Sequence, residues 1–135
     1  MKLLILLGLI LNLTYASVVD SYLNDLKVEV QKSNPNFKGF DIKRGEEIFT
    51  SKHMGKKGKE ISCTSCHGID LTKSSKNFFT GKVIEPLSPV ANPKRFTEVK
   101  NIEKWLRRNF NDVYNRVGTA QEKGDVVTYI LSKDK

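Results

Sequence analysis

Residues 57–73 read KGKEISCTSCHGIDLTK, and the run Cys-Thr-Ser-Cys-His at residues 63–67 holds both cysteines of the chain. It also holds one of the two histidines. Thiolates and imidazoles are the side chains that bind soft and borderline metals, so most of the chain's capacity for such ligands is concentrated here. The fold has to be considered together with whatever this run binds.

Four kinds of chemistry compete for Cys63, Cys66 and His67. A disulfide between residues three apart closes a very small ring and adds little stability. A thioredoxin-type redox pair follows a strand of an α/β fold, and no strand pattern precedes Cys63. A zinc site commonly needs four ligands, and only His53 is left to add. Cys-x-x-Cys-His is the attachment signature of c-type haem, so we expect one haem c, covalently bound through Cys63 and Cys66, with His67 as an iron ligand.

The first 16 residues predict an export signal. Lys2 supplies the positive start, residues 3–13 form a mainly apolar run without charge, and Ala16 is a small residue of the kind that signal peptidases prefer. Cleavage after Ala16 would leave residues 17–135 as one monohaem cytochrome c domain in the periplasm. An uncleaved anchor is the alternative, although the apolar run is short for a membrane span.

The chain is basic, with a formal net charge of +8. For an exported protein we expect no nucleic-acid partner, and an acidic protein or an anionic membrane surface fits the charge better. A basic surface that serves only solubility is the alternative.

The spacing of apolar residues predicts an all-α domain with four helices. The expected helices span residues 18–32, residues 41–52, a segment that starts near 97 or 101 and runs to 113, and a segment from 120 to about 131. Asp41 is the predicted N-cap of the second helix. Thr119 and Glu122 form a predicted capping box at the last one. Residues 68–96, rich in proline and glycine, predict an irregular segment that wraps the haem.

Two details of this pattern predict contacts. A glycine inside the second helix, Gly45, suggests close contact with another helix, and we expect Phe49 beside it to pack near Tyr129 and Ile130 of the last helix. In the irregular segment, we expect a backbone carbonyl near Pro86 and Leu87 to orient the His67 imidazole.

The usual sixth iron ligand of a cytochrome c is missing from the sequence. No methionine follows Cys66 and no histidine follows His67. Met54 and His53 precede the motif in a glycine- and lysine-rich stretch, and we expect a structural or surface role for both. The iron is therefore either five-coordinate or bound by an unusual ligand.

The third predicted helix offers a candidate on its apolar stripe. The stripe consists of Ile102, Trp105, Leu106, position 109 and Val113. Position 109 is asparagine, whereas Asn111 falls off the stripe. A buried asparagine needs hydrogen-bond partners or a metal, or it costs about 1–3 kcal/mol. From the pattern alone, a core asparagine satisfied by backbone or water and an iron ligand both remain open.

Four stretches resemble the SHP-type cytochromes c: SCTSCHGIDLT, TGKVIEPLSPVANPKRFTEV, EKWLRRNFNDV and TAQEKGDVVTYI. The similarity runs from about Gly45 to Ile130. It implies a class I-like cytochrome c fold whose oxidised iron carries the motif histidine, His67, and the asparagine of a Trp-x-x-Arg-Asn segment, here Trp105 to Asn109. It also implies that this asparagine leaves the iron on reduction and opens a site for dioxygen or nitric oxide. A dihaem cytochrome c or a membrane cytochrome b is the implied electron donor.

The resemblance has one departure. Family members often carry two cysteines beside the haem pocket that form a disulfide, and the matching positions here are Phe110 and Gly118. The asparagine is kept, but the disulfide is not.

For four other side chains, two roles remain open. Trp105 either contacts the haem edge or a propionate, or is an ordinary core residue. Arg95, Arg107 and Arg108 are candidates for propionate or partner contacts, with a solvated surface as the alternative for each. The rival to a ligand-binding cytochrome is a simple electron carrier whose iron stays six-coordinate.

Overall fold

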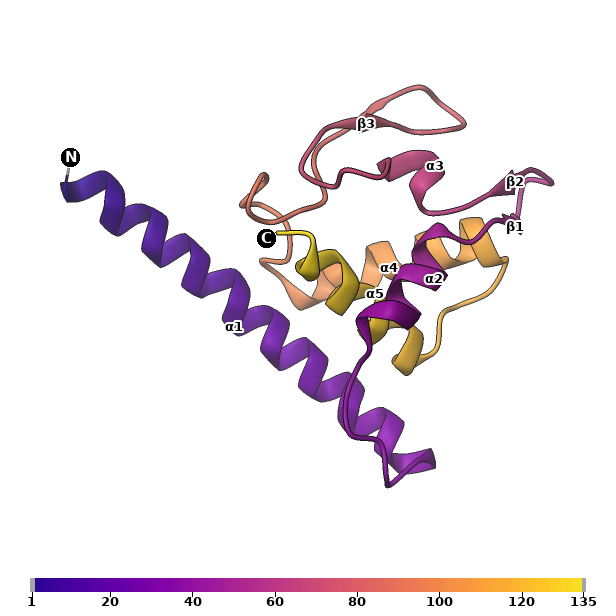
Figure 1. Cartoon of the computed structure of the whole chain (residues 1–135), viewed down its shortest axis with the longest axis horizontal. Coiled ribbons are helices and arrows are strands. Elements are labelled where there is room, and N and C mark those ends of the chain that lie inside the picture. The colour runs from indigo at the N-terminus through magenta and orange to yellow at the C-terminus, as the bar shows by residue number, and fades with distance from the viewer. Residues whose placement is uncertain (1, 135) are drawn as a thin grey trace.

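The computed structural model describes residues 2–134, with side chains from residue 15 onward, and this part of the chain is mainly helical (Figure 1). Its elements are α1 (Lys2–Ser33), α2 (Ile42–Thr50), β1 (His53–Met54), β2 (Glu60–Ile61), α3 (Thr64–His67), β3 (Ser75–Lys76), β4 (Val83–Ile84), α4 (Val99–Tyr114) and α5 (Ala120–Ser132). The all-α prediction is confirmed, and α3 is one further helical turn that contains the motif.

The predicted export segment, residues 1–16, lies mostly outside the described side chains. Within the described part of the chain, no helix has both the length and the apolar character that a bilayer span requires.

Helix α2 begins as predicted. The Asp41 carboxylate accepts a hydrogen bond from the backbone N–H of Arg44 at 2.8 Å and caps the first turn. Gly45 and Phe49 are the buried residues of this helix. Ile42, the first residue of the helix, is 50% exposed, because the buried face begins one turn later.

Helices α2 and α5 cross in close contact at Gly45. A Cβ atom at this position would overlap the backbone carbonyl of Asp125 and would lie 2.7 Å from the Cβ of Tyr129. One turn further on, the rings of Phe49 and Tyr129 pack with centroids 5.4 Å apart. The predicted helix contact at Gly45, and that of Phe49 with α5, are thus confirmed.

A buried carboxylate fixes this crossing. Asp125 on α5 is 1% exposed. It accepts hydrogen bonds from the Asp41 N–H at 2.7 Å and from Arg44 Nε at 2.9 Å. The buried charge is therefore paired and hydrogen-bonded, as burial requires.

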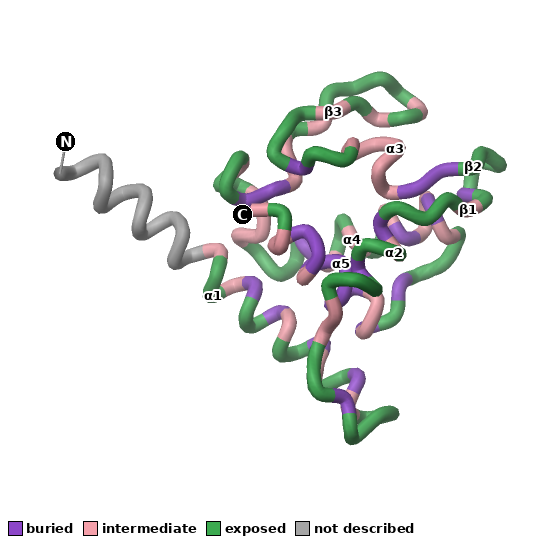
Figure 2. Tube along the Cα trace, in the orientation of Figure 1, coloured by how far each residue is buried: buried purple, intermediate pink, exposed green. Residues whose placement is uncertain are grey.

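Helix α5 carries the predicted capping box. Thr119 accepts from the backbone N–H of Glu122, and the Glu122 carboxylate accepts from the backbone N–H of Thr119 at 2.8 Å. Most of the helix is buried, as the purple tube of Figure 2 shows.

Helix α1 packs against α4 and α5 through one apolar face. Its buried residues are Val19, Tyr22, Leu26 and Val30. Within the same contact, the Tyr22 hydroxyl donates to Glu103 of α4 at 2.5 Å, and Lys123 of α5 donates to the same carboxylate at 2.6 Å. One carboxylate thus joins three helices.

The buried face of α4 differs from the predicted stripe. Ile102 and Val113 are buried as expected, but Phe110 is buried as well, and Trp105 is 44% exposed. The packed face of α4 follows Ile102, Leu106, Phe110 and Val113, at spacings of three and four residues, and Trp105 lies outside it.

The remaining chain forms two short antiparallel hairpins and loops. His53 pairs with Ile61 in the first hairpin, and Ser75 pairs with Ile84 in the second. Apart from β3 and β4, residues 68–96 are irregular, as predicted. In Figure 1, α3 and this segment lie on one side of the α2–α5 pair, while α1 lies on another.

Candidate haem-binding site

The motif folds as a single helical turn, α3. The backbone N–H groups of Cys66 and His67 donate to the carbonyl of Cys63 at 3.2 and 3.0 Å. Gly68 ends the turn with a φ of 72°, a backbone conformation that favours glycine. Residues at i, i+3 and i+4 of a helical turn share a face, so the two thiols and the imidazole project from one side.

Hydroxyl groups hold the start of this turn. The Ser65 hydroxyl accepts from the backbone N–H of Ser62 at 3.0 Å, and the hydroxyls of Ser62 and Thr64 lie 2.5 Å apart. Ser62 is itself buried. The polar residues around the cysteines therefore fix the local backbone.

The two cysteines are not bonded to each other. Burial raises the pKa of the Cys63 thiol to about 12, so this group is a neutral thiol at ordinary pH. Cys66 accepts a hydrogen bond from the N–H of Phe78 at 3.3 Å, which joins the motif to the second hairpin. Among the side chains that the structure describes, no group of three or more Cys, His, Asp or Glu is arranged to hold a metal ion.

The His67 imidazole is sheltered and neutral. Burial, together with the positive charge of Arg95, lowers its pKa to about 4. The neutral ring is the form that binds iron. Its Nδ1 atom is sealed from solvent and has no hydrogen-bond partner among the described residues.

The expected carbonyl contact to His67 is not observed. The Pro86 carbonyl instead accepts from Arg95 Nε at 3.0 Å and from Asn92 Nδ2 at 3.3 Å. Side-chain donors from later in the loop therefore bind the carbonyl that was expected to accept from the imidazole.

An apolar cluster from α2, α4, α5 and the loop adjoins the motif. Its buried members are Phe49, Leu71, Phe110, Val126, Tyr129 and Ile130, and Cys63 and Leu87 pack against it. Aromatic and aliphatic walls of this kind suit the two apolar faces of a haem. The residues present therefore fit the group that the motif predicts.

Asn109 lies beside this cluster on α4, between Leu106 and Phe110, and is half-buried. None of the side-chain hydrogen bonds between described residues involves its amide, and neither amide atom is among the sealed polar atoms without a partner. The amide is therefore accessible and uncommitted to the protein core.

His53 and Met54, which precede the motif in the sequence, lie in the first hairpin. Met54, in β1, is 67% exposed. The His53 ring packs on Tyr114 with centroids 4.2 Å apart. Both placements agree with the structural or surface roles expected from the sequence.

Comparisons with known proteins place this site in a family. A family model described as a domain of unknown function, DUF1924, matches residues 35–130. The cytochrome c-type protein SHP of Cereibacter sphaeroides is 43% identical over 93 residues, which cover 69% of this chain and 71% of that protein. The chain belongs to the SHP-type cytochromes c.

Other relatives agree with this assignment. Cytochrome c'' of Methylophilus methylotrophus is 34% identical over 103 residues, covering 76% of this chain and 72% of that protein. The crystal structure of its oxidised form matches with a TM-score of 0.78 at 29% identity, over 88% of this chain and 97% of that one. Oxidised SHP, described as an oxygen-binding cytochrome c, matches with a TM-score of 0.69 at 36% identity, over 87% and 96% of the two chains. The class I-like cytochrome c fold expected from the sequence is thus confirmed by these haem-binding relatives.

Phe110 and Gly118, the two positions that the sequence resemblance matches to a disulfide, are in contact here. The Phe110 ring lies against Gly118, where a Cβ atom would come within 2.8 Å of the ring carbons. In this chain, a ring packed on a glycine joins the segment after Asn109 to the start of α5.

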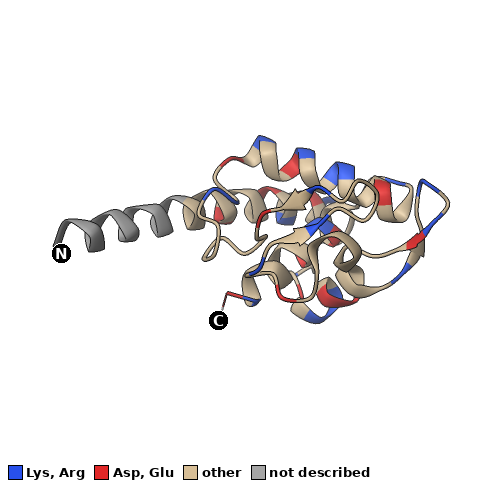
Figure 3. Ribbon diagram, turned by 90° about the horizontal axis from the view of Figure 1, so that it is seen from above, with Lys and Arg blue, Asp and Glu red and all other residues tan. Residues whose placement is uncertain are grey.

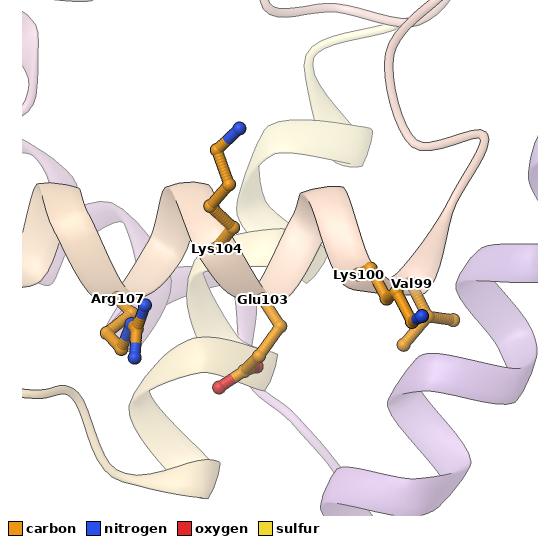
Figure 4. Close-up of a pocket in the computed structure, with 5 residues that line it drawn as sticks. All are labelled: Val99, Lys100, Glu103, Lys104 and Arg107. Atoms are coloured by element: carbon orange, nitrogen blue, oxygen red, sulfur yellow. The ribbon is translucent and has the colours of Figure 1, made fainter.

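The surface hollows of this cytochrome lie elsewhere. One runs along the outer face of α4 and is lined by Val99, Lys100, Glu103, Lys104 and Arg107 (Figure 4). Figure 4 shows Lys104 pointing away from Glu103 and Arg107. Because the motif residues do not line this hollow and its charged groups diverge, we assign it no ligand.

The sequence pattern does not predict the burial of two residues near the site. The predicted apolar stripe passes through position 109. Spacings of four residues from Ile102 through Leu106 lead instead to Phe110, which is buried. Arg95 is not the solvated surface residue that the sequence leaves open as an alternative. Its side chain is half-buried, and its charge acts on His67. No sequence signal marks its burial.

Proposed function

We propose that this SHP-type cytochrome is an exported monohaem protein that accepts an electron and then binds a small gaseous ligand. Cys63 and Cys66 hold the haem as thioethers, and His67 binds the iron from one face. When bound, the haem supplies a redox-active iron with one further coordination position. The helical turn that aligns the three motif side chains, and the apolar cluster beside it, support this assignment.

Asn109 is proposed as the ligand on the opposite face in the oxidised protein. The observation that carries this proposal is its free amide on α4, half-buried beside an apolar cluster without a partner among the described residues. The amide oxygen has lone pairs that no described residue uses, so it is free to coordinate iron. A neutral amide is a weak, hard ligand that suits ferric better than ferrous iron, so Asn109 should leave on reduction.

Once it no longer binds the iron, the Asn109 amide has two free N–H donors. Directed at a small ligand such as dioxygen or nitric oxide, they would stabilise it by hydrogen bonding, while the apolar cluster excludes water. The related SHP is described as an oxygen-binding cytochrome c, which supports the same task here. Trp105, half-exposed beside this region, is proposed to contact the haem edge.

Location and partners complete the proposal. Residues 1–16 act as a cleaved export signal, and residues 17–135 work in the periplasm. The electron donor is a dihaem cytochrome c or a membrane cytochrome b, as the family resemblance implies. The basic surface suits an acidic docking site on such a donor.

Replacing Asn109 by alanine tests the ligand assignment. We expect the ferric absorption and magnetic resonance spectra of Asn109→Ala to change toward a form that lacks the sixth protein ligand. Asn111→Ala is the matched control, because Asn111 is a half-buried asparagine on the same helix. Ferric spectra of Asn109→Ala identical to those of the wild type would remove Asn109 from the iron.

A further inference from the structure

Arg95 closes the irregular segment before α4 and is half-buried. Its guanidinium donates from Nε to the Pro86 carbonyl at 3.0 Å and from Nη2 to the Glu85 carbonyl at 2.9 Å. These two bonds hold the group in one orientation. Its Nη1 atom makes no hydrogen bond to any residue that the structure describes.

Arg95 forms no ion pair with a carboxylate of the described residues, and the exposed Glu85 acts on its charge from a longer distance. Within the described residues, the two arginines in ion pairs are Arg44, with Asp125, and Arg116, with Glu122. Arg107 and Arg108 are unpaired but exposed, so water solvates them. Among these arginines, Arg95 alone combines partial burial with the lack of an ion pair. Carbonyl dipoles stabilise such a charge only in part, and an anion is the partner that it lacks.

Arg95 also lies near the motif. Phe96, the next residue, and Leu87, which follows the Pro86 carbonyl that Arg95 binds, both pack against the apolar cluster that Cys63 also contacts. Burial lowers the pKa of Arg95 itself, which agrees with an incompletely solvated guanidinium. A haem held by Cys63, Cys66 and His67 carries two propionate carboxylates on its edge, and these are the anions that reach this neighbourhood with it.

We propose that Arg95 binds a haem propionate through its free guanidinium N–H groups. The proposal rests on the haem attachment given above and adds a residue that neither the motif nor the sixth ligand defines. Arg95 then joins the carbonyls of Glu85 and Pro86 to the cofactor. The same contact fixes the long loop against the haem, and the guanidinium charge favours the reduced, less positive iron.

The reduction potential of the haem-loaded protein, measured from pH 5 to pH 8, tests this role. Arg95→Gln removes the charge, so we expect its potential to fall at pH 8. A tenfold change in the ratio of oxidised to reduced protein at fixed potential corresponds to about 59 mV for one electron, and the expected fall is of this order. Without the guanidinium charge, the pKa of the propionate rises. A propionate that is protonated at pH 5 no longer carries the negative charge that lowers the reduction potential, so most of the difference in potential from the wild type should disappear there.

Two companion variants separate charge from packing. Arg95→Lys keeps the charge and should retain most of the wild-type potential, while Arg107→Gln, at an exposed arginine, should change nothing. Resonance Raman bands of the propionate groups should shift in Arg95→Gln alone. Equal potential shifts in Arg95→Gln and Arg95→Lys, or a wild-type potential and propionate bands in a folded Arg95→Gln protein, would overturn the proposal. Loss of covalent haem from the wild type would instead contradict the proposed function.

Discussion

At the scale of single residues, this cytochrome depends on positions where little space is left. Gly45 allows α2 and α5 to approach until their backbones touch, and the Phe110 ring fills the space that a side chain at Gly118 would need. Both glycines lie next to residues of the cluster that adjoins the motif. Their lack of a side chain therefore shapes the haem surroundings directly.

Replacing Gly45 by alanine should destabilise the protein, against the usual helical trend. In an exposed helix this change gains about 1 kcal/mol. Here the new methyl group would overlap the Asp125 carbonyl, and overpacking of this kind costs about 1–3 kcal/mol. Thermal unfolding of the haem-loaded protein measures the outcome. Gly39→Ala is the control, because nothing lies within 4 Å of a Cβ atom there; a Gly45→Ala protein as stable as this control would contradict the close contact.

At the scale of elements, α4 is anchored near both ends and less covered between them. Near its start, Glu103 accepts hydrogen bonds from Tyr22 and Lys123. At its end, the Tyr114 hydroxyl donates to the Ile48 carbonyl of α2 at 2.6 Å. Asn109 lies between these anchors, so α1 and α2 jointly set the position of the helix that carries the proposed ligand.

The anchor at Glu103 should fail in acid. Burial alone would raise the pKa of Glu103, but hydrogen bonds from Lys123 and Tyr22 outweigh it and lower the pKa. A lowered pKa contributes stability above the unfolded value of about 4.3, and this stability is lost as pH falls through the folded pKa. We expect Glu103→Gln to cost on the order of 1 kcal/mol at pH 7, because the side chain is 41% exposed and water screens the pair.

Unfolding curves measured from pH 3 to pH 7 check this dependence. The gap between the wild type and Glu103→Gln should begin to narrow near pH 4.3, where the unfolded carboxylate takes up protons, and should close as the pH falls through the lower pKa of folded Glu103. Glu47→Gln, at an exposed position of α2, should show no gap at any pH. A gap for Glu103→Gln that persists unchanged at pH 3 would show that the carboxylate charge is not the cause.

Local signals in the sequence predicted these elements well, and tertiary packing decided the rest. Asp41 and the Thr119–Glu122 capping box satisfy neighbouring backbone groups, so they could be read without the fold. The exposure of Trp105 could not, because it depends on how much of α4 the other helices cover. The half-burial of Arg95 likewise arises from loop carbonyls nine and ten residues earlier in the chain, which no periodic pattern encodes.

At the scale of the whole molecule, much of the positive charge lies in the hairpins around the motif. Residues 52–82 contain seven lysines and two acidic residues, Glu60 and Asp70. Lys57 and Phe79 bring the two hairpins together, with Nζ 4.3 Å from the ring centroid. Figure 3 shows blue positions on these loops as well as on the helices. The hairpin surface should therefore attract negatively charged redox partners.

Electron exchange with small inorganic complexes should reveal this asymmetry. Anionic reagents should react faster than cationic ones at low ionic strength, and salt should reduce the difference. Reversing the exposed Lys56 and Lys82 to glutamate should slow the anionic reagent more than reversing the exposed Lys32 and Lys38, which changes net charge equally. Equal effects of the two double variants would mean that net charge alone governs the rate.

The central claim is that reduction releases Asn109 and opens the iron to a small ligand. The most direct measurement is the absorption spectrum of the reduced wild-type protein, recorded with and without carbon monoxide. We predict a five-coordinate, high-spin ferrous form that binds carbon monoxide readily. A six-coordinate, low-spin ferrous form whose spectrum carbon monoxide leaves unchanged would contradict it and would identify a simple electron carrier.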